Sequence, residues 1–238
     1  MRVNWNYIKG FLLFGLVFFL FAFAKKRNER RLLEEVNLRF TNSENLYITE
    51  ATVNKLLIQN EVRSGSVGKE TLDLNRVESL LEAHDMVENA EVFMTVDGIM
   101  GAEITQKKPL ARILAHNNYY IDRQGQRMPL SEHYSARVPL VTGVSEGQLK
   151  ELHGLLQVVS NDQFLARHII RLHRTPEGKY RIFLRELDFV IIFGAAEDIE
   201  TKFRNFKAFY LKALKDKKLD VYKSVDLQFG NQVICTKK

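Results

Sequence analysis

The sequence is poor in the residues that active-site chemistry usually requires. Its single cysteine, Cys235, excludes a disulfide within the chain. The six histidines show no metal-ligand spacing such as H-E-x-x-H, and His168 and His173 stand five residues apart, which suits a shared helical face poorly. A phosphate-binding loop, a nucleophile elbow and a C-x-x-C pair are all missing. We therefore expect a protein that is not an enzyme, with no catalytic, cofactor-binding or metal-binding residues.

The net positive charge of the whole chain equals that of its N-terminal segment. Residues 1–31 carry seven lysine and arginine residues and one acidic residue, whereas the remainder carries 28 of each sign. The sequence pI of 9.3 therefore reflects the first 31 residues. Such a segment favours contact with anionic lipid headgroups and gives no support for nucleic-acid binding, so we expect no nucleic-acid partner.

One long apolar run follows in residues 10–24, GFLLFGLVFFLFAFA. With its flanking residues it approaches the length of about 20 residues that a membrane span needs. We expect a short cytoplasmic tail at 1–8, a single transmembrane helix at 9–24 and a basic juxtamembrane segment at 25–33. Two observations leave alternatives open. The basic flank argues for a cytoplasmic domain, and Ala22-Phe23-Ala24 resembles a signal-peptide cleavage site.

No repeat, low-complexity tract or Pro/Gly-rich linker divides the remaining residues. Their first part, 34–110, is expected to form a strand at Glu34–Phe40, a helix capped by Thr49 and a second helix starting at Asn75. A hairpin comes next, because a three-residue loop at 97–99 would pair apolar residues on one face. That register sets Met94 against Ala102 and Val92 against Ile104. The expected result is a small β-α-α-β-β module.

The second part, 111–238, has the pattern of a mixed β-rich domain with flanking helices. A capping box at Ser145 and Gln148 starts one helix, and the apolar run Phe189–Phe193 indicates a central strand. A later helix carries an inward stripe of apolar residues, which helical spacing identifies as core: Ile199, Phe203, Phe206, Tyr210 and Ala213.

The last residues predict a hairpin across Gly230-Asn231. A two-residue turn there sets Leu227 opposite Ile234 and Phe229 opposite Gln232 on the core face. The final strand is expected to be a sheet edge that can accept a partner strand. The candidate partner-binding residues are Asp226, Gln228, Phe229, Gln232, Val233, Ile234 and Cys235.

Five phrases in order carry a family resemblance: VENAEVFMTVDG, ITQKKPLARI, YYIDRQGQRMPLS, RVPLVTG and SVDLQFGNQVI. Together they resemble the FtsQ/DivIB family of bacterial cell-division proteins. The family's late motif commonly has Arg and Tyr where this chain has Gln228 and Phe229.

The resemblance implies an α+β protein with one N-terminal transmembrane helix, a POTRA-like domain and a β domain. It also implies a scaffold at the division septum that links early and late division proteins and helps to regulate septal cell-wall synthesis. The scaffold would cross the inner membrane once, expose its C-terminal domain to the periplasm and bind partners of the FtsB and FtsL type. The alternatives are a POTRA-containing envelope assembly protein and a secreted binding protein with a cleaved signal peptide.

Overall fold

The computed structural model describes residues 5–29, 36–41, 47–60, 73–95, 99–230 and 232–238. Its first element is the helix α1, Trp5–Glu29. A membrane span needs about 20 predominantly apolar residues. Among the described residues, no helix meets that demand for length and apolar character, and this finding overturns the transmembrane helix of the expected fold class. The fold class is corrected to a mixed α/β chain with a three-stranded and a nine-stranded sheet.

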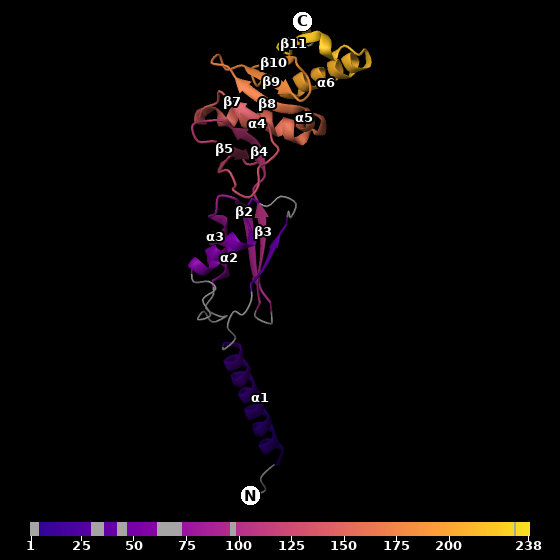
Figure 1. The fold of residues 1–238 in the computed structure, drawn as a ribbon. Helices are drawn as coiled ribbons and strands as arrows, with labels where there is room; N and C mark the ends of the chain where they lie inside the picture. The colour runs from indigo at the N-terminus through magenta and orange to yellow at the C-terminus, as the bar shows by residue number, and fades with distance from the viewer. Residues whose placement is uncertain (1–4, 30–35, 42–46, 61–72, 96–98, 231) are drawn as a thin grey trace. The chain divides into compact units, whose positions relative to one another are not determined.

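The chain forms two compact units, Met1–Gln106 and Lys107–Lys238. The domain limits expected from the sequence, 34–110 and 111–238, stay a prediction. In the first unit the strand order is β1-β3-β2, with β1 parallel and β2 antiparallel to β3. Helices α2 and α3 lie on one face of this sheet (Figure 1). The elements are β1 Val36–Phe40, α2 Glu50–Gln59, α3 Leu74–Glu82, β2 Val87–Met94 and β3 Met100–Gln106.

The two helices begin at polar caps. The Thr49 hydroxyl accepts from the Thr52 backbone N–H at 3.2 Å, which confirms the predicted cap of α2. The predicted start of α3 is wrong, because Asp73 caps the helix by accepting from the Arg76 N–H at 3.2 Å. A carboxylate at the N-cap satisfies one of the free N–H groups of the first turn, and this fixes the start ahead of Asn75.

The predicted register of the β2–β3 hairpin is wrong by two residues. Met94 faces Met100 and Val92 faces Ala102. The turn lies one residue earlier than expected, because the Thr95 N–H donates to the Ile99 carbonyl at 2.9 Å and three residues lie between them. Residues 96–98 of that loop lie outside the described residues. Since side chains alternate along a strand, a shift of two leaves every side chain on its predicted face.

The second unit is built on a sheet with the order β12-β11-β10-β9-β8-β7-β4-β5-β6. Its strands are β4 Pro109–Ile113, β5 Tyr119–Asp122, β6 Arg127–Met128, β7 Leu140–Thr142, β8 Ile169–Arg174, β9 Tyr180–Leu184, β10 Val190–Gly194, β11 Tyr222–Asp226 and β12 Ile234–Lys237. Its helices are η1 Glu146–Gln148, α4 Leu149–Asn161, α5 Gln163–His168, α6 Ile199–Lys215 and η2 Leu219–Val221.

One core joins the helices α4, α5 and α6 to one face of this sheet. The capping box predicted at Ser145 is confirmed, with the Ser145 N–H donating to the Gln148 side chain at 3.0 Å. The inward stripe of α6 is also confirmed, because Phe203, Phe206 and Ala213 are buried. Helix α6 therefore covers the end of the sheet that contains β11 (Figure 1).

Candidate partner-binding edge

Strand β12 lies at one edge of the nine-stranded sheet and is paired on one side, with β11. The Lys238 N–H donates to the Val221 carbonyl at 2.9 Å, so Lys238 turns its backbone toward the β11 side. Alternate residues of an antiparallel strand bond to the same neighbour. Ile234 and Thr236 therefore share that orientation, whereas Cys235 and Lys237 turn their backbone groups to the open side. This is the geometry that strand addition requires.

The predicted turn is present, but the register below it differs. The Gln232 N–H donates to the Phe229 carbonyl at 2.8 Å, as a two-residue turn requires; Asn231 itself lies outside the described residues. Farther along, Ile234 faces Asp226 and not Leu227. The Leu227 N–H instead donates to the Ile192 carbonyl of β10 at 2.9 Å. Leu227, which follows β11, is therefore not paired with β12. The predicted register is wrong by one residue.

A shift of one residue exchanges the two faces of the strand. Cys235 faces the buried Val225, and both Cys235 and Val233 pack against the core. The Ile234 side chain is 43% exposed. The prediction that Ile234 faces the core, with Val233 and Cys235 on the other side, is therefore wrong. Burial raises the pKa of the Cys235 thiol, in keeping with its inward position.

Two of the predicted residues, Asp226 and Gln228, stabilise the bend of the chain at the end of β11. The Gln228 N–H donates to Asp226 Oδ1 at 2.9 Å, and Gln228 Nε2 lies 3.2 Å and 3.1 Å from the two Asp226 oxygens. The Gln228 side chain also covers Gly194, where a Cβ would lie 2.6 Å from Gln228 Cγ. Gly194 has a φ of +78°, a conformation that glycine adopts easily. Asp226 and Gln228 therefore stabilise this bend and are not part of the edge strand β12.

The remaining predicted residues provide exposed side chains or outward backbone groups. Phe229 is 48% exposed and Gln232 is also exposed, next to the exposed Ile234. Val233 and Cys235 contribute backbone groups while their side chains pack inward. The edge can therefore offer backbone hydrogen bonds together with two apolar side chains. Gly194 was not among the predicted site residues, although a glycine directly after a buried strand is a recognisable signal that another part of the chain approaches closely.

A model of the family described as FtsQ/DivIB, C-terminal related, matches residues 108–236, which is more than half of the chain. This chain belongs to the FtsQ/DivIB family. The resemblance seen in the sequence is thereby confirmed, and the chain is a cell-division protein.

The FtsQ/DivIB match covers all but the last two residues of the edge just described. Among solved structures, the chain is similar to the major extracytoplasmic domain of the trans isomer of the bacterial cell division protein DivIB from Geobacillus stearothermophilus. The identity is 14%, the coverage is 47% of this chain and 95% of that chain, and the TM-score is 0.33. No curated protein matches the chain.

The first sheet of this FtsQ/DivIB family member has one edge closed by carboxylates. Glu78 Oε1 accepts from the Val92 N–H at 2.8 Å, and Glu82 Oε1 accepts from the Ala90 N–H at 3.3 Å. Both glutamates come from α3, one turn apart, and both bonds end on the edge strand β2. The outer N–H groups of β2 at these two positions are therefore already occupied. The i, i+4 spacing of the two glutamates is the sequence signal that could have predicted this role.

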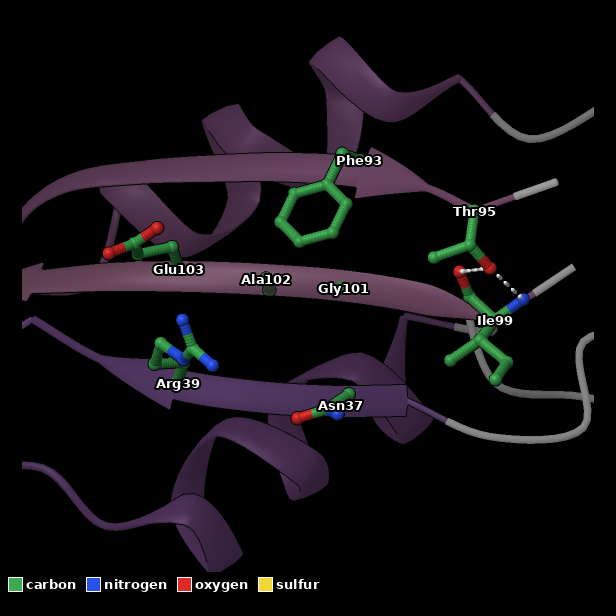
Figure 2. Close-up of a pocket in the computed structure, with 8 residues that line it drawn as sticks. All are labelled: Asn37, Arg39, Phe93, Thr95, Ile99, Gly101, Ala102 and Glu103. Atoms are coloured by element: carbon green, nitrogen blue, oxygen red, sulfur yellow. Dashed lines mark hydrogen bonds between the residues drawn. The ribbon is translucent and has the colours of Figure 1, made fainter. Parts of the chain in front are cut away.

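The face of the first sheet opposite the helices carries a shallow pocket (Figure 2). The Phe93 ring lies over Gly101, where a Cβ would stand 2.4 Å from the ring. Thr95 and Ile99 close one end through the hydrogen bonds drawn there, and Arg39 and Glu103 lie at the other. The pocket has no metal-binding set; among all described residues, no group of three or more His, Cys, Asp or Glu side chains could hold a metal ion.

Proposed function

We propose that this chain is a non-enzymatic scaffold of the bacterial division machinery that binds an extended segment of a partner at β12. The partner is a protein of the FtsB or FtsL type, and the scaffold links early and late division proteins and helps to regulate septal cell-wall synthesis. One observation carries the proposal: Cys235 and Lys237 direct their backbone groups away from β11 at the edge of the sheet, and Cys235 lies within the matched family region.

The strength of such binding can be estimated from the edge. Cys235 and Lys237 offer two N–H and two C=O groups, and each hydrogen bond contributes about 0.5–1.5 kcal/mol. Four bonds give about 2–6 kcal/mol, part of which is lost to ordering of the partner segment. Contacts with the exposed Ile234 and Phe229 side chains are therefore needed for useful affinity. We expect a partner strand with apolar residues on the face that it shares with Ile234.

Cys235→Pro tests the edge directly, with Cys235→Ala as its matched control. Proline removes the outward N–H and places its ring in the path of an added strand. The bonds that Ile234 and Thr236 make to β11 remain possible in both variants. We expect Cys235→Pro to abolish co-purification of the division partners and Cys235→Ala to preserve it, with thermal melting of both variants recorded alongside.

A folded Cys235→Pro variant that still recovers its partners at the wild-type yield would contradict the proposal. Equal loss in both variants would show that the side chain matters and the backbone does not.

We also propose that residues 107–238 lie on the extracytoplasmic side of the membrane. Alkaline phosphatase fused after Lys238 should then be active in cells, and a silent fusion present at normal levels would refute this placement.

A further inference from the structure

Two parts of the chain carry opposite charges that cancel over residues 32–238. Residues 32–106 contain five lysine and arginine residues against 14 acidic residues, a net charge of −9. Residues 107–238 contain 23 against 14, a net charge of +9. Within the second unit the segment 202–223 is the most unbalanced, with eight basic residues and two aspartates. Most of α6 and the turn after it therefore form a strongly positive surface.

This positive surface includes exposed leucines. Leu211 is 64% exposed and Leu214 is 50% exposed, although both belong to a helix whose opposite side is buried. Ala208 lies one turn before Leu211 and is also exposed. Isolated exposed leucines are ordinary, but residues at i, i+3 and i+6 along a helix form one continuous apolar strip.

Basic side chains border the strip on both sides: Arg204, Lys212 and Lys215 are all exposed. None of the ion pairs found among the described residues involves these three. Favourable interaction with the helix dipole accounts for lysines in the last turn of α6. It does not account for leucines between them, which would gain from being covered.

We infer that this outer face of α6, formed by Ala208, Leu211 and Leu214 with Arg204, Lys212 and Lys215, binds an acidic amphipathic helix of a division partner. The inference rests on the proposed function. A helix is the matching occupant because leucines at i and i+3 pack against the same spacing on a second helix. Acidic residues beside that partner's apolar stripe would pair with the three basic side chains.

The α6 face is also continuous with the proposed β12 edge. Asn205 Nδ2 of α6 donates to the Gly230 carbonyl at 2.9 Å, and Phe209 packs edge-on against Tyr222 of β11 with ring centroids 5.3 Å apart. A partner that adds a strand to β12 therefore has α6 within reach of the residues that flank the strand.

Two synthetic helical peptides test the inference with the full chain. One has leucines on one stripe and glutamates beside them, and the other has lysines in place of the glutamates. We expect the acidic peptide to bind and the basic peptide to bind at least about tenfold more weakly, with affinity falling as salt rises. Leu211→Ser with Leu214→Ser should weaken the acidic peptide by about tenfold or more. Ile58→Ser, at an exposed position of α2, is the control and should change nothing.

A charge reversal completes the test. Lys212→Glu with Lys215→Glu should lose the acidic peptide and gain the basic one, which a merely destabilised protein cannot do. Equal binding of the two peptides would overturn the inference, as would no binding at low salt. Binding of the wild type to phosphatidylglycerol vesicles that the leucine variant loses, without peptide binding, would assign the face to a membrane surface instead. Cys235→Pro should leave peptide binding intact, so failure of the β12 proposal is seen separately.

Discussion

Gly194→Ala is the sharpest test of the bend that positions β12. Alanine at a φ of +78° pays a backbone cost of about 1–2 kcal/mol. Its Cβ would also lie 2.6 Å from Gln228 Cγ, so the Gln228 side chain must move away from Asp226. Loss of that side-chain hydrogen bonding adds about 0.5–1.5 kcal/mol. We therefore expect Gly194→Ala to lower the free energy of unfolding by about 1.5–3.5 kcal/mol.

The steric part can be separated by a double-mutant cycle with Gln228→Ala. Truncating Gln228 removes the atoms that the new Cβ meets, so in this background Gly194→Ala should cost only the backbone term of about 1–2 kcal/mol. Urea unfolding of the four proteins measures the difference. An equal cost in both backgrounds would refute the contact with Gln228. Gly143→Ala provides a contrast, because its Cβ would lie 2.1 Å from the Arg174 carbonyl oxygen and no side-chain truncation can relieve it.

Three further predictions concern the two units. Val92→Asp should destabilise the chain by several kcal/mol more than Phe93→Asp in thermal melts, because Val92 is 7% exposed and Phe93 is 52% exposed. Glu78→Ala leaves the Val92 N–H without its acceptor and should cost about 1–3 kcal/mol, with faster hydrogen exchange at Val92; unchanged exchange would contradict the bond. The raised pKa of Cys235 keeps the thiol protonated near neutral pH, so iodoacetamide should react more slowly than with the urea-unfolded chain at pH 7.5, and the difference should narrow as pH rises; equal rates at pH 7.5 would argue against burial.

Local signals in the sequence correctly predicted two helix starts and one buried helix face. The Thr49 cap and the Ser145 capping box depend on side chains within three residues of the groups that they satisfy, so neither needs tertiary context. The α6 stripe was equally readable, because helical periodicity alone places Phe203 and Phe206 on one face. The family was readable from the order of five short phrases and is confirmed by the match over residues 108–236.

Strand register was not readable, because it depends on loops whose hydrogen bonds are made with distant residues. In the β2–β3 hairpin the error of two residues was harmless to the predicted faces. At β12 an error of one residue reversed them, since the Leu227 N–H bonds to Ile192 of a different strand. The apolar run of residues 10–24 suggested a membrane span, which the described helices do not support.

The hydrogen bond from Leu227 to β10 decides which side chains of the final strand face solvent. With the observed pairing, Ile234 is presented outward and Cys235 is held against the core. If Leu227 paired with Ile234, as regular pairing at the same length would require, these two side chains would exchange without any change in the strand itself. Two relatives with the same final strand would therefore present different faces to a partner if the residue at the Leu227 position paired with that strand in only one of them, and grafting this edge onto another scaffold would succeed only if the segment before the strand were transferred with it.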